Sequence, residues 1–366
     1  MKNKFAMFIA GAVALAILPL LAQYFGDGWV RIMDSALLYM MLALGLNIVV
    51  GYAGLLDLGY IAFYAVGAYT FGLLASPHLT ETFAWFENHF KNGLHVWIWV
   101  AIPLGALIAG TAGVLLGTPT LKLRGDYLAI VTLGFGEIIR VFMNNLDAPV
   151  NITNGPKGLD TIDSVKLPGF DFGHTHSIFG LEVHLVTNYY YLLLLLVVAS
   201  VLICYRLERS RIGRAWMAIR EDEIAAKAMG INTRNVKLLA FAMGASFGGV
   251  AGGIFAATQQ FVSPESFGLF ESVIVLAMVV LGGMGHIPGV ILGAILLTLL
   301  PEVLRYTMEP LQMALFGRVL LDAETIRLLV FGIALVAIML YRPAGLWPSA
   351  VRKRELEVAR ASEAAE

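Results

Sequence analysis

Long apolar stretches recur along this chain, and they constrain its fold more than any other feature. A membrane-spanning helix needs roughly 20 apolar residues, because each residue rises about 1.5 Å and the hydrocarbon core is ~30 Å thick. We predict about ten spans, near Phe5–Ala22, Ala36–Val50, Leu55–Leu74, Trp97–Leu116, Tyr127–Met143, Tyr189–Cys204, Lys237–Ala257, Phe270–Leu281, Pro288–Leu304 and Thr325–Tyr341. The stretch at Phe270–Leu281 is too short to cross alone, so it is predicted to be a half-helix or a broken helix.

The composition indicates that lipid is part of the solvent. Apolar residues make up 58% of the chain and charged residues only 14%, whereas charged residues are roughly 25% of soluble domains. A soluble fold of 366 residues could not bury that much apolar surface. We predict an all-α fold, a polytopic transmembrane helical bundle over residues 1–350, followed by a charged cytoplasmic tail at residues 351–366. The net charge of −1 gives no reason to expect nucleic acid as a partner.

Basic residues predict the orientation in the membrane. The segment Arg206–Lys237 contains the bases Arg206, Arg209, Arg211, Arg214, Arg220, Lys227, Arg234 and Lys237, against four acids. Cytoplasmic loops carry an excess of Lys and Arg, so this segment is predicted to be cytoplasmic. Counting spans in both directions places both termini on the same side. The segment 144–188 is poor in bases and is therefore predicted to be the largest external loop.

Glycines interrupt two of the apolar runs, at Gly51-Tyr-Ala-Gly54 and at Gly282-Gly-Met-Gly285. Irregular backbone inside a membrane is tolerated where it lines a cavity. We therefore predict that Gly51, Gly54, Gly282 and Gly285, together with the nearby carboxylate of Asp57, belong to a translocation pathway. The alternative interpretation is that these glycines serve only close helix packing.

The sequence gives no support for chemistry of its own. Gly244-Ala-Ser246-Phe-Gly248 matches the G-x-S-x-G nucleophile elbow, but that motif requires a strand-to-helix turn, and here it lies in an apolar helix. Glycines four residues apart predict close helix packing in lipid, as do Gly113-x-x-x-Gly117 and Gly289-x-x-x-Gly293. No P-loop, nucleophile–base pair or metal motif occurs, so we predict no catalytic residue, no metal site and no ATP site in this chain.

The basic segment also contains a predicted short helix, from Glu221 to Met229. Acids fill its first turn, Glu223 and Lys227 are spaced for an i,i+4 pair, and Gly230 can supply the left-handed residue that ends it. Ile224, Ala225, Ala228 and Met229 form an apolar side. Such a helix either lies on the lipid surface or docks in a groove of another protein. The four acids of the segment Arg206–Lys237 favour docking.

This segment resembles the cytoplasmic segment of ABC importer permeases that contacts the ATPase. Glu223-Ile-Ala225-Ala226 followed by Gly230 is similar to the E-A-A…G signature of those permeases, although it reads E-I-A-A. The chain most resembles the branched-chain amino acid permeases, M-type subunit. The matching segments are Gly51-Tyr-Ala-Gly-Leu-Leu-Asp57-Leu-Gly59, Tyr127-Leu-Ala-Ile-Val-Thr-Leu, Thr153-Asn-Gly-Pro-Lys-Gly158, Phe241-Ala-Met-Gly-Ala, Val262-Ser-Pro264-Glu265-Ser-Phe, Val279-Val-Leu-Gly-Gly-Met-Gly285, Leu300-Pro301-Glu302 and Arg342-Pro-Ala-Gly345-Leu. They cover most of the chain from residue 36 onward.

The resemblance implies an assembly of five parts in the bacterial inner membrane, with a helical bundle of the vitamin-B12-permease-like or ribose-permease-like kind. This chain would pair with a sister permease of the H type. Two ATPase subunits, which carry the ATP and magnesium, would dock below, and a periplasmic binding protein would deliver substrate above. The residues implied to couple to the ATPase are Arg214, Glu223, Ala225, Ala226 and Gly230. Asp160 and Asp163 of the external loop are candidates for docking the binding protein.

The expected function is thus a pore-forming permease subunit for leucine, isoleucine and valine. Related permeases carry other amino acids, urea or short amides, so a different small solute is one alternative. A secondary transporter driven by an ion gradient is another, in which intramembrane carboxylates would bind the ion. A membrane enzyme is the third, and it lacks any supporting motif.

Overall fold

The computed structural model describes residues 2–90, 93–123, 125–167, 169–178, 181–318, 323–342 and 345–347. The predicted charged tail at residues 351–366 lies outside the described residues. Within them the chain is mainly helical, as predicted. The exceptions are four short strands, which pair as two antiparallel two-stranded sheets, β1 with β2 and β3 with β4.

The helices follow the predicted apolar stretches closely. The elements, in chain order, are α1 (Lys2–Phe25), α2 (Asp27–Leu46), the π-helix η1 (Asn47–Tyr52), α3 (Ile61–Leu74), α4 (His78–Thr82), α5 (Ala84–His89), α6 (Ile98–Thr120), α7 (Asp126–Asn145), the 3-10 helix η2 (Gly155–Lys157), β1 (Lys166–Leu167), β2 (Phe170–Asp171), β3 (His176–Ile178), β4 (Leu181–Val183), α8 (Leu185–Glu208), α9 (Arg211–Glu221), α10 (Glu223–Ala228), α11 (Thr233–Gln259), the 3-10 helix η3 (Pro264–Phe267), α12 (Leu269–Gly282), α13 (Ile287–Phe316) and α14 (Ala323–Tyr341). Each of the ten predicted stretches lies in a helix for most of its length. The main difference is at Leu55–Leu74, where the helix begins only at Ile61.

Six segments among the described residues are both long and apolar enough to cross a membrane. They are Asp27–Tyr52, Ile98–Thr120, Leu185–Glu208, Thr233–Gln259, Pro264–Gly282 and Ile287–Ala314. The stretch predicted to be short, α12, reaches this length only together with η3, so it is indeed part of a broken helix. The chain is therefore a multi-pass membrane protein.

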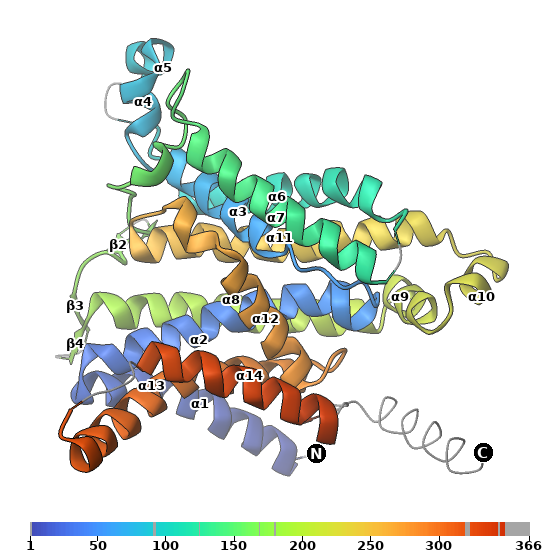
Figure 1. Ribbon diagram of the computed structural model, residues 1–366. Coiled ribbons are helices and arrows are strands. Elements are labelled where there is room, and N and C mark those ends of the chain that lie inside the picture. The colour runs from blue at the N-terminus through green and yellow to red at the C-terminus, as the bar shows by residue number, and fades with distance from the viewer. Residues whose placement is uncertain are drawn as a thin grey trace.

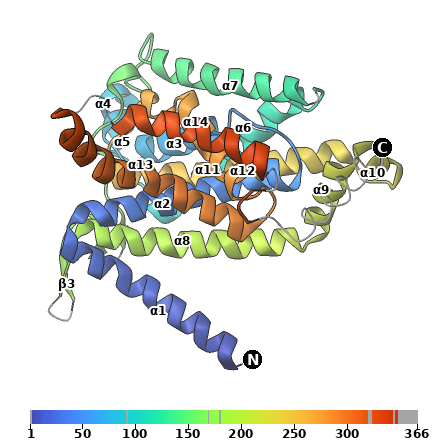
Figure 2. The ribbon, with the colours of Figure 1, turned by 60° about the horizontal axis from the view of Figure 1, so that its bottom comes forward.

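The bundle has two distinct ends. Figures 1 and 2 show the long helices running roughly between them, with α4, α5 and the β-hairpins at one end and α9 and α10 at the other. The segments predicted to be external (144–188) and cytoplasmic (206–237) thus lie at opposite ends. Both are shorter as loops than predicted, because α8 extends from Leu185 to Glu208 and α11 begins at Thr233.

Helix α11 is the central element of the bundle, and it packs most extensively against α6 and α3 and also against α2. Its glycines lie where the other helices cross it. A methyl group added at Gly252 would lie 2.0 Å from the carbonyl oxygen of Tyr64 in α3, and one added at Gly249 would lie 2.7 Å from the carbonyl oxygen of Gly105 in α6. At the two glycines of the G-x-S-x-G match, a methyl group would lie 2.5 Å from Val49 Cγ2 (Gly244) and 3.3 Å from Phe63 Cβ (Gly248), which confirms the prediction that these glycines serve close helix packing.

The hairpin end is held to the bundle by backbone pairing. Leu159 and Val262 form an isolated antiparallel bridge, with N–H···O distances of 2.7 and 2.9 Å, that joins the segment after η2 to the turn after α11. Asp171 caps a turn by accepting from Gly173 N and Ser164 Oγ, both at 2.8 Å. Burial alone would raise the pKa of Asp171, but these hydrogen bonds to its charged form hold the pKa below its ordinary value.

The replacement Gly252→Val tests the packing of α11. The added atoms have no room against the backbone of α3, so the substitution is expected to destabilise the protein by ~1–3 kcal/mol or more. Thermal unfolding of the purified protein in detergent measures this. Gly134→Val in α7 is the matched control, since a methyl group at Gly134 would meet no atom within 4 Å. Equal melting temperatures for the two variants would contradict the packing role.

Candidate functional site

The segment between α8 and α11 folds into two short helices with a break at Asp222. Ser210 caps α9, and its Oγ accepts from Gly213 N at 3.0 Å. Asp222 has an extended backbone, with φ −153°, and its Oδ1 accepts from the N–H groups of Ile224 and Ala225 at 2.7 and 3.0 Å. The predicted helix from Glu221 is therefore wrong at its start. Glu221 ends α9, and α10 begins at Glu223, because Asp222 competes as an N-cap.

The predicted end of that helix is confirmed. Gly230 has φ +87°, and a methyl group there would meet no atom within 4 Å, so its role is backbone geometry alone. The N–H of Gly230 donates to Lys227 O, and that of Ile231 donates to Ala226 O, both at 3.1 Å. This pair of hydrogen bonds is a Schellman motif, which favours glycine in the left-handed position.

Two contacts join α9 and α10 to the start of α11. Trp216 is fully buried, and its Nε1 donates to Val236 O at 2.7 Å. Glu223 forms an ion pair of 2.6 Å with Lys237, which is itself buried. The sequence did not predict this partner for Glu223. Because a buried ammonium is stable only with a partner, the pair holds α10 against the base of α11.

The apolar side of α10 is directed to solvent. Ile224 and Met229 are 73% and 83% exposed, and Ala225 is also exposed, whereas Ala226 is buried. In the views of Figures 1 and 2, α10 projects beyond the ends of the membrane helices. Large apolar side chains at an exposed tip, next to charged residues, are typical of a surface that docks another protein. Arg214, in α9, is exposed and donates to Arg209 O at 2.9 Å, so it stabilises the turn from α8.

The two glycine-broken turns of the membrane helices meet in space. Asn47 begins η1, and its Oδ1 accepts from the N–H of Gly285, in the turn between α12 and α13, at 2.8 Å. A methyl group at Gly51 would lie 2.0 Å from Asn47 Oδ1 and 2.6 Å from Gly285 N, so glycine is required there. π-Helical turns of this kind are frequent at functional sites. The two turns are therefore in contact, and their place in a translocation pathway stays a prediction.

Arg220, at the end of α9, reaches into both turns. Its Nη1 donates to Gly51 O at 2.5 Å. Its Cγ lies 2.8 Å from the position that a methyl group would take at Gly54, and Nη1 lies 3.0 Å from the corresponding position at Gly285. In the sequence, Arg220 is only one of the eight bases that predict the orientation. No local pattern marks it, because its partner Gly51 is 169 positions away.

Asp57 lies close to these turns but is buried rather than lining an open cavity. Its side chain is 2% exposed, and its Oδ1 accepts from Gly59 N at 2.9 Å. The adjacent Leu58 N donates to Thr132 Oγ1 at 3.0 Å, which joins this turn to α7. A methyl group at Gly282 would lie 2.2 Å from Gly289 O, so that glycine permits the close crossing of α12 and α13.

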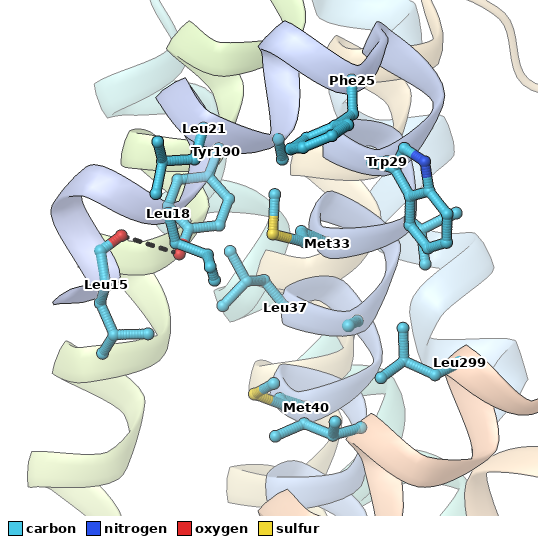
Figure 3. Close-up of a pocket in the computed structure, with 14 residues that line it drawn as sticks. Leu15, Leu18, Leu21, Phe25, Trp29, Met33, Leu37, Met40, Tyr190 and Leu299 are labelled. Carbon is cyan, nitrogen blue, oxygen red and sulfur yellow. Dashed lines mark hydrogen bonds between the residues drawn. The ribbon is translucent and has the colours of Figure 1, made fainter. Parts of the chain in front are cut away.

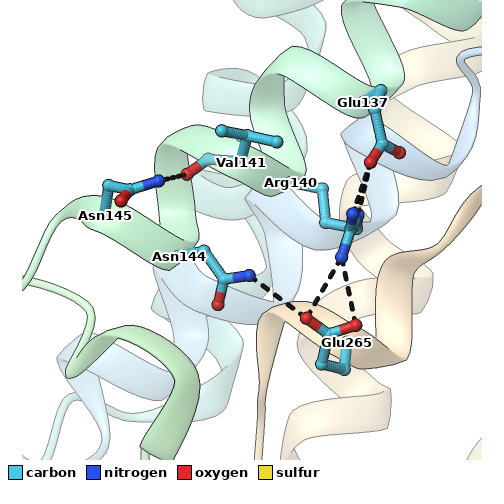
Figure 4. A network of polar contacts seen from close by, with 6 residues as sticks. All are labelled: Glu137, Arg140, Val141, Asn144, Asn145 and Glu265. Carbon is cyan, nitrogen blue, oxygen red and sulfur yellow. Dashed lines mark hydrogen bonds and ion pairs between the residues drawn. The ribbon is translucent and has the colours of Figure 1, made fainter.

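At the hairpin end, Arg140 joins α7 to η3 (Figure 4). Arg140 pairs with Glu137, three residues earlier in α7, with Nε at 2.9 Å from Glu137 Oε1. The guanidinium also donates to both oxygens of Glu265, at 3.0 and 3.1 Å, and Asn144 Nδ2 donates to Glu265 Oε1 at 3.1 Å. An arginine between two carboxylates satisfies its planar array of donors. The network holds the end of α7 to the chain that follows α11.

The two acids predicted to dock a binding protein differ in their surroundings. Asp160 is exposed. Asp163 is partly buried, pairs with His95 and lies 3.9 Å from Lys166 Nζ, and its N–H donates to Ala75 O at 2.8 Å. Asp163 therefore ties the external segment to the chain before α6, while Asp160 presents its charge outward.

A large cavity of about 600 Å³ lies between α1, α2, α8 and α13 (Figure 3). Its lining includes Leu18, Phe25, Trp29 and Met33, and is almost wholly apolar. Tyr190 donates from its hydroxyl to Leu15 O at 3.1 Å, and the indole of Trp29 also lines the cavity. The cavity therefore offers few hydrogen-bond partners to a polar solute.

Comparisons with known proteins agree with this architecture. A family model described as the permease component of the branched-chain amino acid transport system matches residues 28–339. The LivM high-affinity branched-chain amino acid transport system permease protein of Escherichia coli K12 is 42% identical over 355 residues, covering 93% of this chain and 75% of that protein. LivM of Salmonella typhimurium is 42% identical and covers 88% of this chain and 70% of that protein.

More distant relatives include the LivH permease protein of Escherichia coli K12. It is 24% identical over 262 residues, covering 71% of this chain and 79% of LivH. No solved structure matches the chain. Because the family model spans most of the chain and two relatives share 42% identity over most of it, this chain belongs to the family of branched-chain amino acid transport system permease components.

Proposed function

We propose that this chain is a pore-forming permease subunit of an ATP-driven importer that carries branched-chain amino acids across the bacterial inner membrane. Family membership and the names of the LivM relatives support the transport role and the solute class. The chain performs no covalent chemistry. ATP and magnesium bind to two ATPase subunits, and a periplasmic binding protein delivers the solute.

The proposed partner within the membrane is a sister permease similar to LivH. The likeness of this chain to LivH supports a pair of related subunits, since both halves would use the same bundle. We propose about ten membrane-crossing or partly crossing helices, in the arrangement of vitamin-B12 or ribose permeases. In this topology α9, α10 and both termini face the cytoplasm, while the β-hairpins face the periplasm.

The proposed mechanism rests on the hydrogen bond between Arg220 and the turn at Gly51. An ATPase that grips the exposed side chains Ile224 and Met229 moves α10, and α9 moves with it because Trp216 and Glu223 hold both helices to α11. Arg220 then displaces the turn at Gly51, to which it is bonded. Because that turn is also bonded to Gly285 through Asn47, the displacement reaches α12 and α13 together. Such a movement shifts the pore between two packings.

Transport in proteoliposomes, with ATP enclosed and the binding protein outside, tests the proposed class of transporter. The chain is expressed with its sister permease, ATPases and binding protein, and uptake of labelled leucine is followed. Uptake is expected to require ATP, to stop with vanadate and to survive an ionophore. Uptake that survives vanadate but is abolished by an ionophore identifies a secondary transporter instead, and competition by urea or short amides identifies another solute class.

Arg220→Gln is expected to uncouple ATP hydrolysis from transport. The substitution removes a charge-assisted hydrogen bond to Gly51 O, whose loss lowers transport at least about tenfold. ATP hydrolysis by the assembled complex should continue but lose its stimulation by the loaded binding protein. Arg211→Gln, at the exposed start of the same helix, is the matched control. Full transport by Arg220→Gln would refute the coupling route.

Gly230→Val is expected to abolish transport while the protein still inserts and assembles. A β-branched residue is strained at φ +87°, so the end of α10 must change. Gly230→Asn is the control, because asparagine tolerates the left-handed conformation, and it should retain transport. Membrane insertion is measured by fractionation and transport by leucine uptake. Normal uptake by the valine variant would show that the docking helix does not depend on Gly230.

Asp160→Lys is expected to weaken docking of the binding protein without changing folding, since Asp160 is exposed. Affinity of the reconstituted complex for the loaded binding protein measures the effect, together with the melting temperature. Asp163→Lys is expected to lower the melting temperature, because it breaks the contact with His95. An unchanged affinity in Asp160→Lys would remove this residue from the docking surface.

A further inference from the structure

A second cavity lies inside the hairpin end of the bundle, between α2, the start of α8 and the end of α11. Its volume is about 260 Å³. The side chains that α2 contributes are Arg31, Asp34, Ser35 and Leu38, which share one face of the helix. The volume lies below the ~300–1,000 Å³ typical of drug-sized ligands, so the cavity suits a smaller solute.

The cavity carries two opposite charges one helical turn apart. Oδ1 of Asp34 is buried and has no hydrogen-bond partner among the described residues. A buried carboxylate without a partner is costly, and a cationic ligand group would remove that cost. Arg31, which is exposed, supplies a guanidinium that can bind a carboxylate through two parallel hydrogen bonds.

The opposite wall is apolar. Val186 and Leu193 of α8 and Leu38 of α2 line this part of the cavity, so an aliphatic group fits against them, while Thr258 and Gln259 at the end of α11 add polar groups. Tyr189 also lines the cavity; its hydroxyl donates to Ala257 O at 3.1 Å and accepts from Val165 N at 3.2 Å. The wall is thereby joined to the external segment that follows α7. The cavity is therefore placed to receive a solute from the hairpin end.

We propose that this cavity is a binding site for a free aliphatic α-amino acid. Its ammonium lies at Asp34, its carboxylate at Arg31, and its side chain between Leu38 and Leu193. The identity of the solute rests on the proposed function, but the site itself rests on the two charges and the apolar wall. An ethanolamine lipid headgroup also carries an ammonium, with an anionic phosphate in place of the carboxylate. The experiment therefore distinguishes a free amino acid from a lipid headgroup as the ligand.

The test uses the complete transporter in nanodiscs and measures binding of labelled leucine without the binding protein. Asp34→Asn and Arg31→Gln are each expected to weaken binding about 10- to 100-fold, the loss of one charge-assisted contact. Glu182→Gln is the control, since that acid is exposed at the same end of the bundle and outside the cavity. ATP-driven leucine uptake by the unaltered complex is measured in parallel.

Two leucine analogues give a readout that a purely structural role would not change. Leucinamide lacks the carboxylate, so the unaltered complex should reject it, and Arg31→Gln should lose that discrimination. The acid 4-methylpentanoate lacks the ammonium, so the unaltered complex should bind leucine in preference to it. Asp34→Asn should lose this preference for leucine. Unchanged affinities and selectivity in both variants, beside normal uptake by the unaltered complex, would overturn the site alone. Absence of uptake by the unaltered complex would overturn the proposed function.

The alternative that the cavity binds a lipid headgroup is tested by changing the lipid composition of the nanodiscs. Nanodiscs of phosphatidylcholine alone and nanodiscs with phosphatidylethanolamine are compared for each variant. The proposal expects the same loss of leucine binding in both. A loss that occurs only with phosphatidylethanolamine would assign the cavity to a lipid headgroup and overturn the amino acid site.

Discussion

The bundle depends on the close approach of other helix backbones to α11. Lipid tails are as apolar as the side chains they surround, so helices in a membrane associate through van der Waals contact rather than a hydrophobic drive. Glycine at positions 249 and 252 lets α6 and α3 reach that contact distance. The same helix begins beside α10 and ends beside the bridge between Leu159 and Val262. A shift at either end is therefore carried along one well-packed element.

In α9 and α10 the charged side chains contact the membrane helices and the large apolar side chains are exposed, an arrangement that suits a coupling element. Arg220 and Glu223 carry charges, and both use them inward, on Gly51 and Lys237. Ile224 and Met229 are apolar, and both are exposed. The polar contacts fix the unit to the membrane helices, where low dielectric strengthens them, and the apolar tip remains for a partner. The hairpin end has its own network around Arg140, so α7 is held there and again at Thr132.

Much of the candidate site could be predicted where the chemistry is local. The end of α10 at Gly230 and the pair of Glu137 and Arg140 follow from residues within one helical turn, and both are present. The break at Asp222 was missed, because an acid in a helical pattern can equally serve as first-turn charge or as N-cap. The role of Arg220 could not be predicted, since a base in a segment with many other bases carries no signal of its distant partner.

The membrane setting, the helical class, the positions of the long apolar helices and the likeness to permeases can all be inferred from the amino-acid sequence alone. These follow from apolar stretches of fixed length and from charges counted along the chain, which do not depend on how helices pack. The meeting of the turns at Gly51 and Gly285 beside Arg220, and the position of Asp34 and Arg31 in one cavity with aliphatic side chains of α8, depend on the three-dimensional packing. Those contacts arise where helices cross. The position of each crossing depends on which small residues of the two helices lie opposite one another.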